Sequence, residues 1–530
     1  MVLTYAAPTF DELIRPFGVT DTGITFVDPD GSTHLSYDEI ASRAASASQD
    51  LSDRGVKPGD TVAVVIESTP AGVAALLAVW LAGATVMSLP PPPRRGKDEA
   101  LPLYKEAFGD LLRSCVLVLG SSRLQDALAP EHEVTDTASL DFSSGRPAPD
   151  VEVAEVALIQ FTSGSTGTPR GVVLHSTTIA SHTAAICEAV DFHPEDGDSC
   201  VSWLPLYHDM GLIGMLLSPM NRRGPLVLMT PSVFARDPGA WMRKCAETGA
   251  TVTCAPDFAY RLAARVSRFG KPIGDLSALR VCLCGAERVQ WATMEAFAEA
   301  FEDKGLRWEA LKPVYGMAET TLAISFPPND RGPRRSRGDV VALGHPLPGI
   351  EVRIDDSSGT DVGRIGLKGP WMFDSYLTSQ GRVEAFDEDG WFWTNDVGFV
   401  EDGELFVLGR TDEAVIVRGR NVFAEDVEAI ATWAPGVEAI GAAAFRAAEG
   451  DDRFALVVEV LNDDARELSR FGRDIQASVT QALEATVSPV VFVRPKTIPR
   501  TTSGKPIRRA CREIHAGAGW EEDSVVARVT

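Results

Sequence analysis

The chain has 530 residues, of which 45% are apolar and 23% charged, so it has globular composition and exceeds the usual length of one domain. Its formal net charge of −24 argues against a nucleic-acid or anionic-membrane partner, because affinity for phosphate comes from clustered lysine and arginine. The eight cysteines show no CxxC spacing, so neither a disulfide framework nor a zinc ribbon is indicated. The first residues carry no basic segment followed by an apolar run, so we expect no signal peptide and a cytoplasmic location.

The N-terminal region alternates between helical and extended periodicity. It predicts helices over residues 9–17 and 37–51 and strands over 24–27 and 60–66. The span from Ala71 to Leu89 carries no charge and has the length of a membrane helix. Its alanines and glycines instead favour a helix over 71–82, a turn, and a strand over 84–89. We therefore expect a buried βαβ element and no membrane span.

A loop of glycines and hydroxyls lies between two strand-like runs, at residues 162–167. Glycine lets backbone N–H groups approach an anion closely, and hydroxyls can donate to phosphate oxygens or reach a magnesium ion. The loop lacks the Gly-Lys-Ser/Thr ending of a Walker A motif, since Pro169 is the fifth residue after Gly164. A flexible Ser/Gly-rich turn is the alternative interpretation. The hydroxyls come from Thr162, Ser163, Ser165 and Thr166.

Strand and helix patterns alternate as far as about residue 330, which predicts a mostly parallel sheet covered on both faces. Ligands bind at the carboxyl ends of strands in such sheets. Polar clusters that follow strand-like runs are therefore expected to converge there. These clusters are residues 203–211, 254–260, 284–287 and 314–320.

Past residue 340 the pattern changes to short strands with glycine-rich turns, which continue to Gly409 and Arg410. A compact α+β pattern follows, with strands near 415–417 and 455–461 and a helix from about 465 to 486. We expect an α/β protein with a large multilayer N-terminal domain of mostly parallel sheets and a small mobile α+β C-terminal domain. The expected boundaries are 1–410 and 411–530.

Five ordered motifs resemble those of the adenylate-forming superfamily of acyl-CoA synthetases, nonribosomal adenylation domains and luciferases. The loop 162–167 resembles its phosphate loop, and Tyr315-Gly316-Met317-Ala318-Glu319-Thr320 resembles its adenine and metal motif. Asp396 resembles the ribose-binding aspartate. Gly409-Arg410 with residues 418–421 resembles the hinge and the loop after it, and residues 502–505 resemble the motif of the catalytic lysine.

Within this superfamily the sequence motifs are most similar to those of fatty acyl-AMP ligases. The motifs concerned are residues 203–214, 229–234, 256–260 and 508–512. The segment from Phe326 to Leu343 is shorter than expected for that subclass, so an acyl-CoA synthetase that uses free CoA is the alternative. A catalytically silent relative that binds nucleotide or carrier protein is a third hypothesis. It is motivated by four departures from the family pattern, Arg170, Asn395, Glu413 and Pro506.

The resemblance implies ATP-dependent activation of a fatty or related acid to acyl-AMP, with transfer to the phosphopantetheine thiol of an acyl carrier protein. ATP and Mg²⁺ are the implied cofactors. The implied catalytic residues are Lys505, Glu319 and His208, and the implied metal ligands are Glu319 and Thr166. Nucleotide binding is implied for Thr162, Ser163, Gly164, Ser165, Thr166, Gly167, Gly285, Ala286, Glu287, Tyr315, Gly316, Met317, Ala318, Thr320, Asp396 and Arg410. The candidate acyl pocket comprises Trp203, Met210, Gly211, Ile213 and Gly214, which can equally be core residues.

Other interpretations remain for several of these residues. Lys505 can be an exposed tail lysine, and His208 an oriented structural histidine. Asp396 and Arg410 can form a plain surface ion pair. Asp209 and Asp257 keep an amino-bearing substrate possible. The arginines at 331, 334, 335 and 337 form the one local basic patch of an acidic chain, either a solvated loop or a surface for an acidic carrier protein.

Overall fold

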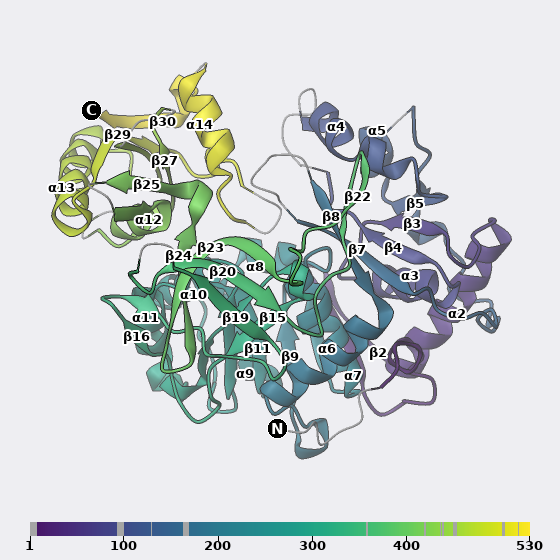
Figure 1. The fold of residues 1–530 in the computed structure, drawn as a ribbon. Helices are drawn as coiled ribbons and strands as arrows, with labels where there is room; N and C mark the ends of the chain where they lie inside the picture. Colours follow the sequence, from purple (N-terminus) through teal and green to yellow (C-terminus); the bar gives the residue numbers. More distant parts are fainter. Residues whose placement is uncertain are drawn as a thin grey trace.

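The computed structural model describes residues 8–92, 100–128, 130–162, 169–356, 359–417, 420–434, 436, 439–448, 453–500, 504–517 and 519–530. Figure 1 shows a large body that contains the N-terminal part of the chain and a smaller unit, coloured light green to yellow, that contains the C-terminal part. The two are joined near the end of a long green strand. The predicted α/β fold with a small α+β C-terminal unit is confirmed.

An eight-stranded sheet carries the glycine-rich loop. Its strand order is β22-β21-β8-β7-β4-β3-β5-β6. Strands β3 to β7 pair in parallel, whereas β7 and β8 on either side of the loop pair antiparallel. The strands are β3 (Thr61–Val64), β4 (Thr85–Ser88), β5 (Leu117–Gly120), β6 (Thr135–Asp136), β7 (Val156–Thr162), β8 (Arg170–His175), β21 (Tyr376–Thr378) and β22 (Gly381–Val383).

A seven-stranded sheet forms the second layer, with the order β13-β12-β11-β9-β10-β1-β2. All of its neighbours pair in parallel except β1 and β2. Cys282 and Cys284 alternate along β12 and are fully buried in the core. The strands are β1 (Gly23–Asp28), β2 (Gly31–Ser36), β9 (Cys200–Ser202), β10 (Leu226–Met229), β11 (Val252–Pro256), β12 (Val281–Gly285) and β13 (Leu311–Pro313).

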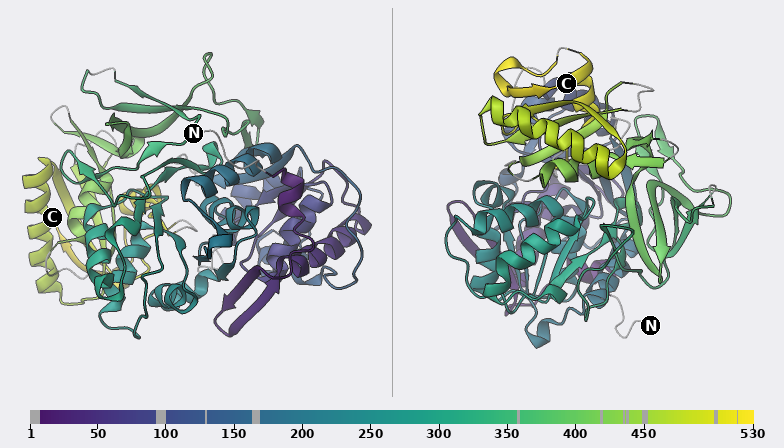
Figure 2. Two further views of the ribbon diagram at one scale, coloured as in Figure 1. Left: turned by 90° about the horizontal axis from the view of Figure 1, so that it is seen from below. Right: turned by 90° about the vertical axis from the view of Figure 1, so that its left-hand side faces the viewer.

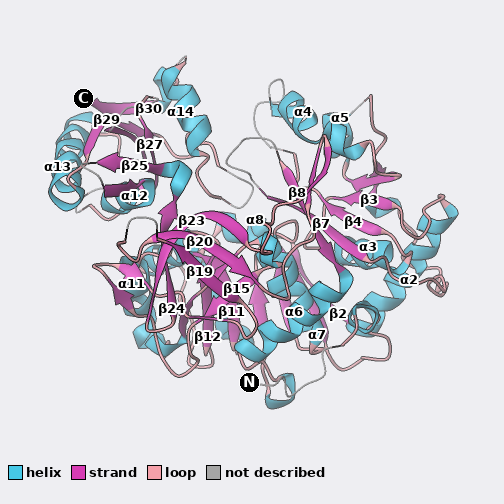
Figure 3. Cartoon of the chain, viewed as in Figure 1, coloured by secondary structure: helices cyan, strands magenta, loops and turns pink. Residues whose placement is uncertain are grey.

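Helices cover both large sheets (Figure 3). They are α1 (Phe10–Ile14), α2 (Tyr37–Asp53), α3 (Pro70–Leu81), α4 (Ala100–Leu112), α5 (Ser122–Leu128), α6 (Ser176–Ala189), α7 (Ser218–Asn221), α8 (Pro231–Arg236), α9 (Gly239–Thr248), α10 (Asp257–Ser267) and α11 (Trp291–Phe301). The uncharged span is α3 followed by β4, as predicted. No helix within the described ranges is long and apolar enough to cross a membrane. The first helix is shorter than predicted because Arg15 precedes Pro16, and a residue before proline disfavours helical backbone.

A third layer contains the short strands predicted past residue 340. Its four-stranded antiparallel sheet has the order β19-β20-β23-β24. These strands are β19 (Glu351–Asp355), β20 (Gly363–Lys368), β23 (Phe392–Glu401) and β24 (Glu404–Arg410). Smaller strands beside it are β14 (Tyr315–Gly316), β15 (Ala323–Phe326), β16 (Arg335–Ser336), β17 (Val340–Val341) and β18 (His345–Pro346).

The C-terminal unit has a four-stranded sheet, β27-β28-β29-β30, with a core of its own that includes Phe454, Ile475 and Phe492. Figure 2 shows α13 lying across one face of this sheet. The elements are β25 (Ala414–Val417), β26 (Arg420–Phe423), α12 (Ala424–Thr432), β27 (Ala439–Arg446), β28 (Arg453–Val460), α13 (Ala465–Leu483), β29 (Thr486–Val493), α14 (Arg508–Ala516) and β30 (Val525–Val529).

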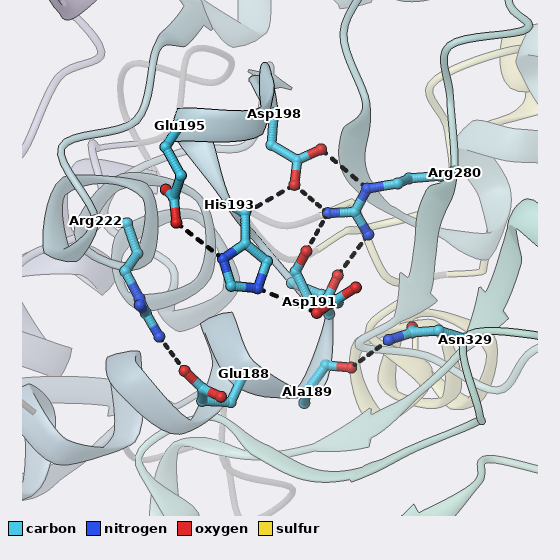
Figure 4. Close-up of polar contacts among 10 residues, drawn as sticks. Glu188, Ala189, Asp191, His193, Glu195, Asp198, Arg222, Arg280 and Asn329 are labelled. Carbon is cyan, nitrogen blue, oxygen red and sulfur yellow. Dashed lines mark hydrogen bonds and ion pairs between the residues drawn. The ribbon is translucent and has the colours of Figure 1, made fainter. Parts of the chain in front are cut away.

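A polar cluster fixes the chain where it leaves α6 and enters β9 (Figure 4). Arg280 donates to the carbonyl oxygens of Val190 (2.7 Å) and Asp191 (2.5 Å), and its Nε lies 2.9 Å from Asp198 Oδ1. The His193 ring lies between carboxylates, with Nδ1 3.1 Å from Glu195 Oε1 and Nε2 3.1 Å from Asp191 Oδ1. Its bond to Glu195 is the main reason that the pKa of His193 is raised. The cluster stabilises this connection and contains none of the predicted site residues.

Candidate active site

A cleft of about 1450 Å³ lies between the two units. Side chains from the ends of β7, β11 and β12 contribute to it, so the predicted convergence at the carboxyl ends of strands is present. The residues at 163–167 lie outside the described part of the chain. The predicted site residues that line the cleft are Thr162, His208, Met210, Gly214, Ala286, Glu287, Tyr315, Gly316, Met317, Ala318, Glu319, Asp396, Arg410 and Lys505.

Two predicted nucleotide-binding residues lie behind this lining. Thr320 is fully buried, and its hydroxyl donates to the Met317 carbonyl oxygen at 3.0 Å. Gly285 ends β12, where a Cβ atom would lie 2.9 Å from Val314 Cγ2. Both residues therefore shape the backbone of the site and do not line it.

The predicted acyl pocket is wrong for three of its five residues. The Trp203 ring stacks on Phe234 with 3.7 Å between centroids, and Ile213 is fully buried in the core. A side chain at Gly211 would meet the carbonyl oxygen of Pro205 at 2.1 Å. Most side chains of this segment pack into the core, where residues 210–217 form a π-helix.

Glu319 is held on a short helical turn, where its carbonyl oxygen accepts from the Phe373 N–H at 2.9 Å. The hydroxyl of Tyr376 donates to Glu319 Oε1 at 2.6 Å. Burial raises the pKa of Glu319, and the bond from Tyr376 partly opposes this. Arg170 Cζ lies 5.5 Å from the Tyr376 ring centroid and also lines the cleft. A half-buried carboxylate that lines the cleft fits the magnesium ion implied by the sequence, because the ion would offset its negative charge.

Asp396 lies in a hydrogen-bonded corner of the cleft. The Tyr315 hydroxyl donates to Asp396 Oδ2, and Thr394 Oγ1 accepts from the Asp396 N–H at 3.0 Å. Arg410 pairs with Asp396 across β23 and β24, with Nη1 4.0 Å from Oδ1. Burial raises the pKa of Asp396, while Arg410 and the Tyr315 bond oppose it. The side chain of Asp396 is only 14% exposed, so this is a pair inside the cleft and not a surface ion pair.

Asp257 does not have the geometry expected for binding a substrate amine. Its Oδ1 accepts from the Gln290 N–H at 2.9 Å and its Oδ2 from the Thr293 hydroxyl at 2.9 Å. Burial raises the pKa of Asp257 to about 7, and the nearby Glu287 contributes to the rise. Glu287 Oε1 accepts from the Phe258 N–H at 2.6 Å. These bonds fix the strand end at 285–287 against α10.

Lys505 lies in the cleft and is not an exposed tail lysine. Its positive charge helps to lower the pKa of Asp209 and partly opposes the rise in the pKa of Asp396, and all three residues line the cleft. The preceding Gly504 packs against Phe258, where a Cβ atom would lie 3.1 Å from Cε1. The small domain therefore brings Lys505 into the same cleft as Glu319.

Glu413, predicted at the hinge, is bound inside the small domain. Arg508 of α14 pairs with Glu413, with Glu425 Oε1 (3.0 Å) and with Glu428 Oε1 (2.8 Å). Burial raises the pKa of Glu413 to about 8. Glu413 is thus anchored to α12 and α14 of the small domain.

The basic loop at 331–337 is neutralised by ion pairs, which favours a solvated loop over a surface for an acidic carrier protein. Arg331 and Arg334 pair with Glu404, and Arg334 Nη1 lies 2.8 Å from Asp402 Oδ2. The linear sequence suggested a basic patch because the acidic residues that pair with most of these arginines are distant in sequence and are brought beside them only by the fold. The remaining pairs are Arg335 with Asp339 (2.5 Å) and Arg337 with Asp361 (2.7 Å).

Comparison with known proteins agrees with this geometry. A family model described as AMP-binding enzyme matches residues 20–377, and the chain belongs to that family. Rv1013 of Mycobacterium tuberculosis is 34% identical over 92% of this chain and 96% of its own length. The long-chain-fatty-acid–AMP ligase FadD26 of the same species is 29% identical over 94% of this chain and 95% of its own. A solved structure from work on fatty acyl-adenylate ligases from E. coli and L. pneumophila has a TM-score of 0.83, with 27% identity over 98% of this chain and 99% of that one.

The resemblance to the adenylate-forming superfamily, and within it to fatty acyl-AMP ligases, is thereby confirmed. Several contacts of the site were not predicted. Tyr376 lies on β21, which reaches the site by pairing with β8, and no local pattern marks it. The pairing of His208 with Asp209 could have been suspected from their adjacency.

Proposed function

We propose that the chain activates a fatty or related carboxylic acid with ATP to acyl-AMP, releasing pyrophosphate, and then transfers the acyl group to the phosphopantetheine thiol of an acyl carrier protein. The observation that carries the proposal is the position of Lys505, which the small domain places in one cleft with Glu319 and Asp396. Domains 1–410 and 411–530 would act as the units that rotate between the two steps.

The chemistry requires cationic groups because the carboxylate and the α-phosphate repel each other. Lys505 lines the cleft, and its charge would stabilise the negative charge that develops between them. Asp396, with Tyr315 and Arg410, would bind the ribose hydroxyls, and residues 286–287 would present backbone to the adenine. Mg²⁺, held by Glu319 and Thr166, would supply further positive charge at the phosphates.

The acyl chain would occupy the apolar part of the cleft, beyond His208. Met210, Gly214, Leu322, Phe326 and Leu343 are apolar residues that line the cleft, and they would contact the acyl group. The name of FadD26 as a long-chain-fatty-acid–AMP ligase supports a fatty acid as the substrate. An amine-bearing acid is disfavoured because Asp257 and Asp209 are engaged by large-domain donors.

Carboxylate-dependent exchange of labelled pyrophosphate into ATP tests the first step. We expect exchange with medium- and long-chain saturated acids, strongly reduced for acetate and absent without added acid. A Glu319→Ala variant is the matched control and should lose the signal. Absence of exchange with every acid of a broad panel would support the catalytically silent alternative.

The acceptor is tested by comparing a holo carrier protein with free CoA at equal concentration. We expect transfer to the carrier to be well above transfer to CoA, because the segments at 203–214 and 256–260 resemble those of acyl-AMP ligases. CoA thioester formation at the carrier rate would instead support the acyl-CoA synthetase alternative.

A further inference from the structure

Asp209 lies near His208 of the large domain and Lys505 of the small domain. Its side chain is 13% exposed, and its Oδ1 accepts from the Met210 N–H at 2.7 Å. His208 Nδ1 lies 2.6 Å from the same oxygen. Burial alone would raise the pKa of Asp209, but His208, the Met210 N–H and Lys505 together lower it below its usual value. Asp209 is therefore an ionised carboxylate inside the cleft, with one fixed neighbour and one that belongs to the small domain.

The His208 ring is oriented by this carboxylate. The backbone around it is fixed, because the His208 N–H donates to Pro205 O (3.2 Å) and the Leu212 N–H donates to His208 O (2.8 Å). His208 lines the cleft, and its Nε2 has no hydrogen-bond partner among the residues that the structure describes. An imidazole held at Nδ1 by a buried carboxylate, with Nε2 left for a reactant, is the arrangement of a general base.

We propose that His208 Nε2 accepts the thiol proton during thioester formation and that Asp209 is the residue that positions His208 for it. The inference rests on the proposed function, because the acyl-AMP and the thiol are its substrates. The thiol sulfur forms a bond to the acyl carbon, and the bond from that carbon to the phosphate oxygen breaks. AMP leaves with the electron pair of the broken bond, and the proton passes to Nε2 and then to solvent.

The position of Lys505 explains why one carboxylate serves both steps. During adenylation Lys505 lies near Asp209, which helps to hold the ammonium in the cleft. When the small domain rotates and removes Lys505, the His208 ring remains beside Asp209. The carboxylate then stabilises the imidazolium that forms as the thiol loses its proton.

The alternative role for Asp209 is purely structural, because its bond to the Met210 N–H caps the π-helix. Asp209→Asn keeps an oxygen for this cap but removes the charge that orients and stabilises His208. His208→Ala leaves Asp209 and its cap in place. The two variants therefore separate a defect in folding from a defect in proton transfer, and thermal unfolding midpoints provide the check on folding.

The experiment supplies preformed acyl-AMP and pantetheine to the full-length protein and measures thioester formation by rapid quench across pH. Positioned proton transfer contributes about 10²-fold or more, so both variants should fall by about that factor. The acid limb of the pH–rate profile should shift in Asp209→Asn. Added imidazole should restore transfer in His208→Ala but not in Asp209→Asn, where the ring still fills the site.

The inference is overturned if Asp209→Asn keeps the parent pH–rate profile, if imidazole leaves His208→Ala unchanged, or if the parent transfers no acyl group to pantetheine. Failure of the proposed function gives a different result, since the parent would then show no carboxylate-dependent pyrophosphate exchange. If the parent protein exchanges pyrophosphate and any of these three results is also obtained, the proposed adenylation stands and only the proposed role of His208 is rejected.

Discussion

Arg288 of the large domain and Asp426 of the small domain form an ion pair, with Nη1 2.6 Å from Oδ1. Their side chains are 13% and 26% exposed, and burial raises the pKa of Asp426 while Arg288 opposes it. A second contact across the domains is weaker, since Arg265 Nη1 donates to the Ala439 carbonyl oxygen at 3.3 Å. The pair lies beside residues 286–287, which are proposed to contact adenine, so it stabilises the arrangement in which Lys505 occupies the cleft.

Arg288→Met should therefore slow adenylate formation without slowing acyl transfer from preformed acyl-AMP. Loss of a partly exposed ion pair corresponds to about 1 kcal/mol, or about fivefold in the population of this arrangement. Rapid-quench measurement of each half-reaction checks the prediction. Arg337→Met is the matched control, because its ion pair with Asp361 lies within the large domain. Equal slowing of both half-reactions by Arg288→Met would contradict the conclusion that this ion pair stabilises the adenylation arrangement.

Tyr376→Phe should make adenylation more sensitive to acid. The lost hydroxyl bond is one of the groups that lower the pKa of Glu319, so this pKa rises further above its ordinary value. Magnesium binding requires the carboxylate, which is present above the pKa and is lost as pH falls through it. The loss of rate should thus be larger at about pH 6 than at about pH 8, and more Mg²⁺ should be needed at the lower pH. An identical pH profile in the variant and the parent would show that Tyr376 does not act through Glu319.

Gly214→Leu should reduce the maximum chain length of the carboxylic acids that the protein accepts as substrates. A Cβ atom at Gly214 would lie 3.0 Å from Leu322 Cδ2, and both residues line the apolar part of the cleft. We expect kcat/KM for a long-chain acid to fall by about tenfold or more, while a short-chain acid is affected little. Gly214→Ala is the graded control and should have a smaller effect. Equal losses for all chain lengths would place the acyl chain elsewhere.

His193→Gln should destabilise the fold in a pH-dependent manner (Figure 4). The pKa of His193 is higher in the folded protein than in the unfolded chain. The protonated ring therefore stabilises the fold fully at pH values below the unfolded-state pKa, and this stabilisation is lost as the pH rises through the folded-state pKa. The ring is 37% exposed, so we expect less than about 1 kcal/mol at about pH 5.5 and almost none at about pH 8.5. Denaturant unfolding at both pH values checks this. His345→Gln is the control, because its ring contacts the Gly403 carbonyl oxygen. A pH-independent loss would contradict the charge-based explanation.

Much of the fold could be predicted from the sequence because each signal is local. The helix α3 and strand β4 could be separated within an uncharged span by their alanine and glycine content. Ligands lie at the carboxyl ends of parallel strands, and this rule correctly predicted that residues 254–260, 284–287 and 314–320 converge on one cleft.

The remaining features depend on partners that are distant in sequence. Arg334 belongs to a basic patch in the linear sequence, whereas the fold brings Asp402 and Glu404 beside it. Tyr376 reaches Glu319 through a strand pairing that no local periodicity encodes. The acyl pocket was misassigned at Trp203 because a buried apolar segment looks the same whether it lines a cleft or the core.

The half-reactions of Lys505→Ala test the central claim most directly. Lys505 shares a cleft with Glu319 and Asp396, so its loss should slow adenylation by about 10²-fold or more, equivalent to about 3 kcal/mol of lost charge stabilisation. Transfer from preformed acyl-AMP does not need that charge and should continue at nearly the parent rate, with the fold unchanged. Rapid-quench measurement of both steps gives the result. Normal ATP-dependent adenylate formation in this variant, or equal losses in the two steps, would contradict the assignment of Lys505 as the residue that switches between them.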